Sequence, residues 1–122
     1  MIEIQRLTKS FSYAWEGVMY TYRHHQNLRI HFVVAVMVII ISMFLHVNSL
    51  EKGILGITIL LVICAEMINT AIEQMVNLIS TEHRKEAKIA KDVSAGMVLL
   101  TAVGSVIIGI IIFAPYIVKL FL

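Results

Sequence analysis

The sequence predicts an all-α integral membrane protein, with an N-terminal amphipathic surface helix followed by three membrane-spanning helices. The chain of 122 residues is 59% hydrophobic and has a mean hydropathy of +0.87, which is unusual for a soluble domain of this length. Its apolar residues gather in three long stretches, and a helix of about 20 residues is enough to cross a bilayer. Most of the charged residues lie between those stretches. One domain over residues 1–122 accommodates this arrangement.

Residues 1–27 are predicted to form the surface helix. Apolar side chains recur there at steps of three and four residues, at Ile4, Leu7, Phe11, Trp15, Val18 and Tyr22. Charged side chains lie off this stripe, and the tryptophan and tyrosines favour the headgroup region of a membrane. The alternative is a soluble helix packed on a core, but little else in the chain can form a soluble core.

The three spans are expected at 28–47, 54–80 and 93–122, with a polar break between the first two. The second span carries polar side chains in its last third. The third contains Pro115, which we expect to bend or shorten its far end. Glycine, alanine and serine residues in the same span provide surfaces that other helices can approach closely.

Lysine and arginine residues predict the orientation in the membrane. Four lie before the first span or in its first turn, at Arg6, Lys9, Arg23 and Arg29, and four lie in the loop 81–92, whereas the other two ends hold only Lys52 and Lys119. By the positive-inside rule, the N-terminal helix and this loop face the cytoplasm. The net charge of +2 is too small to suggest a nucleic-acid partner.

Four polar side chains of the second span, Glu66, Asn69, Glu73 and Asn77, are spaced three, four and four residues apart. On a helix this spacing places them on one stripe. An acidic residue within the hydrocarbon costs about 2.5 kcal/mol or more on insertion scales, so we expect the carboxylates to be functional. Glu73, the carboxylate nearer the cytoplasmic end of the span, can hold a divalent cation beside phosphates. Glu66, the deeper carboxylate, can take a proton from a hydroxyl. Asn69 can orient either group.

Lys91 and Asp92 are expected to close the charged loop at the start of the third span. The lysine can neutralise phosphate charge, and the aspartate can cap that helix or hold the lysine in place. There is no glycine-rich phosphate-binding loop, so phosphates must be bound by scattered charged groups and metal. Structural roles remain open: the glutamates as protonated packing residues, Asp92 as an N-cap only, and the other loop charges as a solvated face.

Two segments resemble the signature of the small prokaryotic diacylglycerol kinase family. They are Glu66-Met67-Ile68-Asn69-Thr70-Ala71-Ile72-Glu73, with Asn77 after it, and Ala90-Lys91-Asp92, followed by Ala95-Gly96-Met97-Val98-Leu99. The resemblance extends over essentially the whole chain. The Arg-Ile-His run at 29–31 and the Lys-Asp-x-x-Ala-Gly segment look more like the Gram-positive branch, whose members resemble undecaprenol kinases.

This resemblance implies a homotrimer that transfers the ATP γ-phosphate to a lipid alcohol with magnesium, at active sites shared between neighbouring subunits. Glu66 then looks like the catalytic base, Asn69 orients the reacting groups and Glu73 is a metal ligand. The nucleotide contacts that it implies are Arg6, Tyr13, Glu82, His83, Arg84, Lys91 and Asp92.

One position departs from the family pattern. The family usually has a metal-binding glutamate four residues before the arginine matched by Arg29, and this chain has His25 there. Histidine can ligate metals but suits magnesium poorly, so either a second metal is held differently or activity is reduced.

Undecaprenol is favoured over diacylglycerol as the lipid substrate by the branch resemblance alone. The rival function from another class is a small ion- or proton-coupled transporter or rotor subunit, which would also bury a glutamate in a span. A third possibility is a catalytically silent membrane partner. The polar stripe runs out to a basic loop, which favours phosphate chemistry over transport.

Overall fold

The computed structural model describes the whole chain, residues 1–122, as four helices without a strand. They are α1 (Ile4–His24), α2 (Gln26–Phe44), α3 (Ser49–Ile79) and α4 (Lys85–Phe121). The last three are each long and apolar enough to cross a membrane. This confirms the prediction of an all-α chain with three candidate spans.

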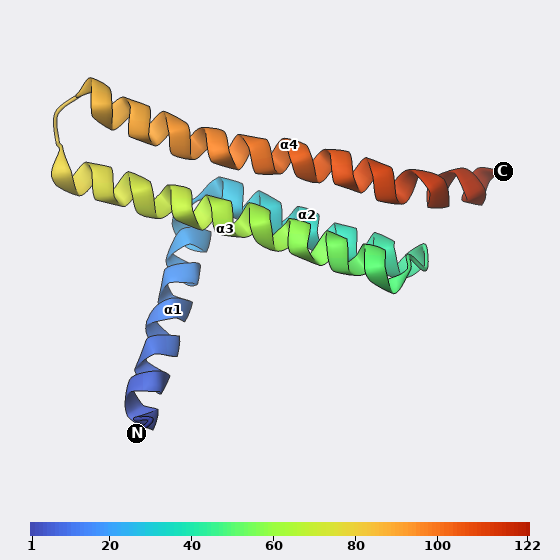
Figure 1. Cartoon of the computed structure of the whole chain (residues 1–122), viewed down its shortest axis with the longest axis horizontal. Coiled ribbons are helices and arrows are strands. Elements are labelled where there is room, and N and C mark those ends of the chain that lie inside the picture. The colour runs from blue at the N-terminus through green and yellow to red at the C-terminus, as the bar shows by residue number, and fades with distance from the viewer.

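Helix α1 leaves the bundle steeply, whereas α2, α3 and α4 run alongside one another (Figure 1). His25 alone separates α1 from α2, with extended backbone. At this corner the Arg29 guanidinium donates to the carbonyl oxygens of Arg23, at 2.8 Å, and Tyr22, at 3.3 Å, which are among the carbonyls that a helix end leaves unpaired. The apolar stripe of α1 is uncovered, with Trp15 66% exposed. A helix of this kind suits the plane of a membrane surface.

Helix α3 packs along both α2 and α4. A small apolar core lies where the α2–α3 turn meets the C-terminal part of α4, formed by Val47, Leu55 and Ile112. Asn48 begins α3 at this end, because its side-chain oxygen accepts from the Glu51 backbone N–H at 2.9 Å and its amide donates to the Glu51 carboxylate at 2.7 Å. This reciprocal cap satisfies a free N–H of the first turn.

The expected helix boundaries were wrong at two places. Helix α3 begins at Ser49 instead of residue 54, because the Asn48 cap recruits the polar residues of the expected break into its first turn. Helix α4 begins at Lys85 instead of residue 93. Residues 85–92 are mostly good helix formers, and Lys88 pairs with Asp92 one turn on, at 2.5 Å.

The early start of α4 changes the setting of Lys91 and Asp92. Both lie in its second turn, so Asp92 is not an N-cap, a position that Arg84 occupies. The expected charged loop 81–92 is reduced to the short connection between Ile79 and Lys85. Pro115 does not shorten the helix, which continues to Phe121. Proline costs α4 one backbone hydrogen bond there.

The length of α3 and α4 determines where their connection lies. With 31 and 37 residues, they extend about 46 and 55 Å, well beyond the hydrocarbon thickness of about 30 Å. Their connected ends reach past the point where α1 joins the bundle (Figure 1). On α3, the level of α1 is marked by Gln74, whose side-chain amide donates to the Tyr20 hydroxyl of α1 at 3.3 Å. The connection therefore lies beyond α1, on the aqueous side of a membrane whose surface α1 follows.

Candidate functional site

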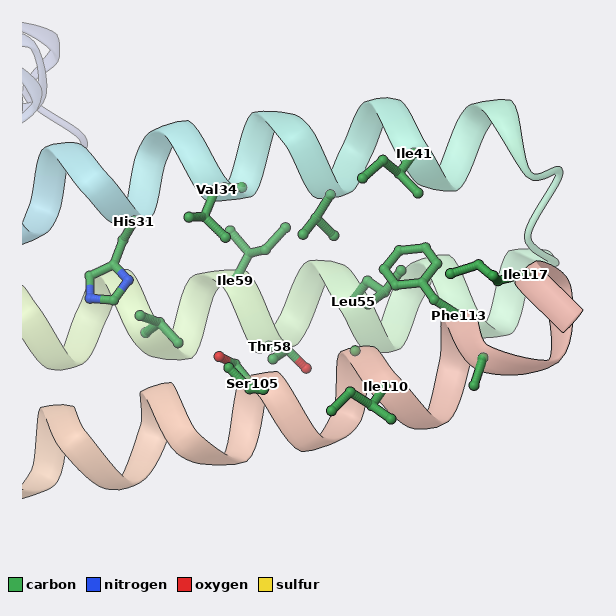
Figure 2. A pocket seen from close by; sticks show the side chains of 16 residues that line it. His31, Val34, Ile41, Leu55, Thr58, Ile59, Ser105, Ile110, Phe113 and Ile117 are labelled. Carbon is green, nitrogen blue, oxygen red and sulfur yellow. The ribbon is translucent and has the colours of Figure 1, made fainter.

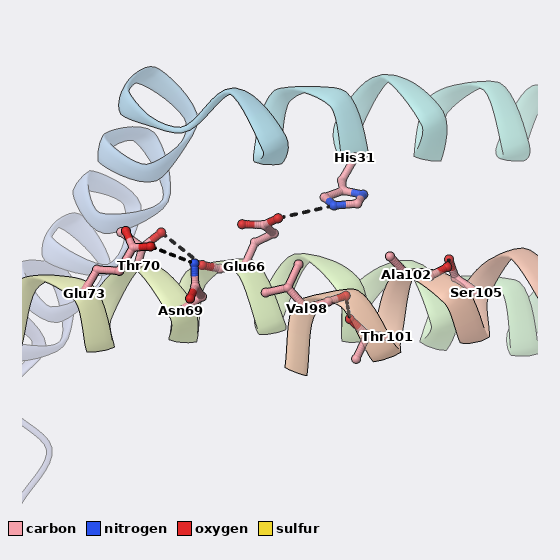
Figure 3. Close-up of polar contacts among 9 residues, drawn as sticks. All are labelled: His31, Glu66, Asn69, Thr70, Glu73, Val98, Thr101, Ala102 and Ser105. Atoms are coloured by element: carbon pink, nitrogen blue, oxygen red, sulfur yellow. Dashed lines mark hydrogen bonds and ion pairs between the residues drawn. The ribbon is translucent and has the colours of Figure 1, made fainter. Parts of the chain in front are cut away.

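Three of the four stripe residues on α3 face the inside of the bundle. Glu66 is 2% exposed, Asn69 is 9% exposed and Glu73 is half-buried. The Asn69 amide donates to a Glu73 carboxylate oxygen at 3.3 Å (Figure 3). Its carbonyl oxygen accepts from the Ser94 hydroxyl of α4 at 2.7 Å. Asn69 is thus held between the Glu73 carboxylate and the neighbouring helix, and the orienting role expected for it stays a prediction.

Glu66 lies deeper, between α2 and α4. Its Oε1 atom is 3.4 Å from Nε2 of His31 on α2 (Figure 3), and this oxygen has no hydrogen-bond partner. A buried carboxylate without strong partners is costly. It is also a group that can accept a proton from a substrate placed beside it.

The stripe continues outward onto α4. The Lys91 ammonium donates to the Asn77 side-chain oxygen at 2.7 Å, so the predicted phosphate-binding lysine sits directly at the end of the stripe. Asp92 pairs instead with Lys88. This hydrogen bond and the charge attraction raise the pKa of the Lys88 ammonium, which lies in the aqueous first turn of α4.

A polar hollow of about 850 Å³ lies between the ends of α3 and α4. It gathers five of the predicted nucleotide contacts: Glu82, His83, Arg84, Lys91 and Asp92. Four of its lining residues are lysine or arginine and two are acidic. A concave site with excess positive charge suits a polyanion such as a triphosphate.

Two further predicted nucleotide contacts lie away from this hollow. Arg6 pairs only with Glu3, at 2.8 Å, and its side chain is 84% exposed. Tyr13 is exposed as well. Both belong to α1, the helix that leaves the bundle (Figure 1). One chain alone therefore does not bring them to the site, and their role stays a prediction that requires a neighbouring subunit.

The single chain offers one plausible magnesium ligand. No group of three or more His, Cys, Asp or Glu side chains gathers to hold a metal. Magnesium, however, needs only one or two carboxylates together with water and substrate phosphates. Glu73 fits that requirement because its carboxylate is half-buried and paired only with a neutral amide. His25 lies at the corner between α1 and α2, and its role in metal binding stays a prediction.

An apolar groove of about 470 Å³ runs between α2, α3 and α4 (Figure 2). Twelve of its 16 lining residues are hydrophobic. His31 lies at the end nearest the polar stripe, and Phe113 and Ile117 lie toward the other end (Figure 2). The groove therefore leads along the bundle to the His31–Glu66 pair.

Sequence reasoning missed His31 and Ser94 as members of this site. Each contacts a stripe residue from another helix, 35 residues before Glu66 and 25 residues after Asn69. The spacing of residues within one helix does not predict which residues of another helix they contact.

The chain resembles known lipid kinases over most of its length. The family described as prokaryotic diacylglycerol kinase matches residues 12–113. A protein named diacylglycerol kinase from Synechocystis is 42% identical over 84% of this chain, and the match covers 59% of that longer relative. The undecaprenol kinase of Bacillus subtilis is 39% identical over 93% of this chain and 92% of its own length.

The diacylglycerol kinase of Escherichia coli K12 is 28% identical over 84% of either chain. The family match spans the whole polar stripe of α3, the cationic hollow and most of the groove. The chain therefore belongs to the prokaryotic diacylglycerol kinase family, a family of lipid kinases.

Proposed function

We propose that the protein transfers the γ-phosphate of ATP to the hydroxyl of a membrane lipid alcohol, and that this alcohol is undecaprenol. The observation that carries the proposal is the position of Glu66. This buried carboxylate lies where an apolar groove meets a polar stripe, and the stripe ends in a cationic hollow. Lipid and triphosphate can thus approach it from opposite ends.

In the proposed reaction the apolar part of the lipid lies along the groove, and its hydroxyl reaches Glu66. The carboxylate accepts the hydroxyl proton as the alcohol oxygen attacks the γ-phosphorus. Asn69, which accepts from Ser94 at 2.7 Å, orients the Glu73 carboxylate, to which its amide donates. Lys91 and Arg84 stabilise negative charge on the phosphates. Such a transfer depends on positioning and electrostatics, which a short chain can supply.

Magnesium is the cofactor in this proposal, with Glu73 as its ligand and His25 as a second candidate. When bound, the ion neutralises charge on the phosphates of ATP. The exposed positions of Arg6 and Tyr13 support a homotrimer in which α1 of one subunit completes the site of another. The orientation proposed places α1 and the α3–α4 connection in the cytoplasm, where ATP is available.

The choice of undecaprenol rests on the Bacillus subtilis relative, which is similar over nearly the full length of both chains. Diacylglycerol remains the alternative substrate, because the Synechocystis and Escherichia coli relatives bear that name. A transporter is disfavoured, since the stripe ends in a cationic hollow on one side and does not continue through the outer half of α3.

Parallel assays decide between the lipids. The purified protein is offered radiolabelled ATP with undecaprenol or diacylglycerol in mixed micelles, at equal mole fractions and with magnesium. We expect kcat/KM to be at least about tenfold higher for undecaprenol, which corresponds to about 1.4 kcal/mol in transition-state binding. Higher turnover of diacylglycerol would reverse the substrate proposal, and labelling of neither lipid would reject the kinase proposal itself.

A further inference from the structure

Glu66 has one ionisable neighbour that the proposed reaction does not yet use. His31 of α2 places Nε2 at 3.4 Å from Glu66 Oε1 (Figure 3). That oxygen is buried and has no hydrogen-bond partner. The His31 side chain is 23% exposed, whereas that of Glu66 is 3% exposed. The histidine therefore connects a buried carboxylate with a more open part of the protein.

His31 is the only basic side chain that pairs with Glu66. The α4 side chains drawn near this pair, Val98, Thr101, Ala102 and Ser105, are not titratable (Figure 3). On α3 the nearest acid is Glu73, which pairs with Asn69. Helix α1 directs Tyr20 to Gln74, two turns farther out. His31 is thus the group through which a proton on Glu66 can leave.

The proposed reaction needs such a route. Every turnover delivers the hydroxyl proton of one alcohol to Glu66, and the carboxylic acid must lose that proton before the next turnover. Direct loss to bulk water is hindered because the carboxylate is 2% exposed. The distance of 3.4 Å between Glu66 Oε1 and His31 Nε2 is longer than a typical hydrogen bond. Catalytic hydrogen bonds are often this long without substrate and shorten when the substrate binds.

We propose that His31 is a positioning residue that acts through Glu66: as the neutral tautomer with its hydrogen on Nδ1, it accepts the Glu66 carboxyl proton at Nε2 after phosphoryl transfer. This inference rests on the proposed function, in which Glu66 is the base. In the first step the alcohol O–H bond breaks and its proton joins Glu66. The new O–P bond forms as the bond from the γ-phosphorus to the bridging oxygen breaks, and ADP leaves with that electron pair. The proton then passes from Glu66 to Nε2 of neutral His31, and the imidazolium releases it to water.

Kinetics of His31 variants test this role. His31→Gln and His31→Ala should lower kcat by about tenfold or more, a loss typical of proton-transfer groups, and leave KM for ATP within about twofold. Added imidazole should restore part of the kcat of His31→Ala, because the small base can occupy the vacated space beside Glu66. His46→Asn is the matched control: His46 is exposed in the turn after α2, with φ of 55°, which asparagine tolerates.

A second measurement does not depend on turnover or on the His31 variants. NMR spectra of protein with ¹⁵N-labelled histidine are recorded in micelles at one fixed pH, with and without Glu66→Gln. The ring ¹⁵N chemical shifts of His31 should change when the neighbouring carboxylate is replaced, and those of His46 should not.

The outcomes separate the inference from the proposed function. If Glu66→Gln stops turnover while His31→Gln stays within about twofold of wild-type kcat, the inference is overturned and the base role stands. Loss of kcat in His31→Ala without imidazole rescue, together with unchanged His31 ring chemical shifts in Glu66→Gln, would reduce His31 to a packing role and also overturn the inference. If Glu66→Gln itself keeps its kcat, the proposed function fails first. Should the His31 variants not fold, the comparison of NMR chemical shifts alone decides.

Discussion

Removal of the Ser94 hydroxyl tests whether the site is held together across helices. Ser94 is 3% exposed, and its hydroxyl donates to the Asn69 side-chain oxygen at 2.7 Å, with the Lys91 carbonyl oxygen of its own helix as a second acceptor at 2.9 Å. The substitution Ser94→Ala removes that bond and leaves the Asn69 oxygen buried without this donor. Hydrogen bonds between membrane helices contribute about 0.6 to 1.7 kcal/mol. We therefore expect a loss of about 1 kcal/mol in the free energy of unfolding, or about fivefold in the equilibrium constant.

The same substitution should lower kcat, because Asn69 also donates to Glu73 and a freed amide no longer fixes that carboxylate. We expect a fall of about threefold to tenfold, in line with 1 kcal/mol of lost orientation. Unfolding is followed by titration with a denaturing detergent, and turnover by the radiolabelled-ATP assay. Ser42→Ala is the matched control, because Ser42 is equally buried at 5% but bonds only within its own helix, to Ile39 at 2.7 Å. Equal effects of the two substitutions on kcat would refute the reasoning.

Three further predictions address the hollow, the fold and the metal. Lys91→Gln should raise KM for ATP about tenfold, because the positive charge proposed to contact the phosphates is lost. The control Lys119→Gln, in the last turn of α4, should leave KM for ATP unchanged. Equal KM values for the two variants would remove Lys91 from the nucleotide site. Asn48→Ala should lower the free energy of unfolding by about 1 kcal/mol, measured with a denaturing detergent, because the α3 cap is lost. Its kcat should stay within about twofold of wild type. A larger change in kcat would show that the cap also shapes the site. His25→Glu should lower the magnesium concentration needed for half-maximal activity, because a carboxylate suits magnesium better than imidazole; an unchanged requirement would exclude this position from metal binding.

Local sequence patterns predicted most of the fold because its elements are long and strongly apolar. The three spans and the amphipathic α1 follow from hydropathy and from the spacing of apolar residues. The boundaries followed less well, since they depend on caps and charge pairs. The Asn48 cap moved the start of α3, and the Lys88–Asp92 pair helped to move the start of α4. Hydropathy averages treat such residues only as polar.

The candidate site could be predicted in part. The stripe from Glu66 to Asn77 is encoded within one helix, and the structure places three of its members inside the bundle. Lys91 meets that stripe because α4 runs beside α3. The contacts of His31 and Ser94 depend on how separate helices are aligned, which helical spacing does not specify. Arg6 and Tyr13 lie on the exposed helix α1, and their role in the site stays a prediction that requires a partner subunit.

The central claim is that Glu66 accepts the alcohol proton, and turnover by Glu66→Gln tests it most directly. The variant keeps the size of the side chain and removes its basicity. It is compared with Glu51→Gln, at the opposite end of the same helix, after both have been shown to retain the wild-type oligomeric state. We expect Glu66→Gln to lose all measurable phosphorylation of the lipid while Glu51→Gln keeps it. Retention of more than about a tenth of wild-type kcat by Glu66→Gln would contradict the account.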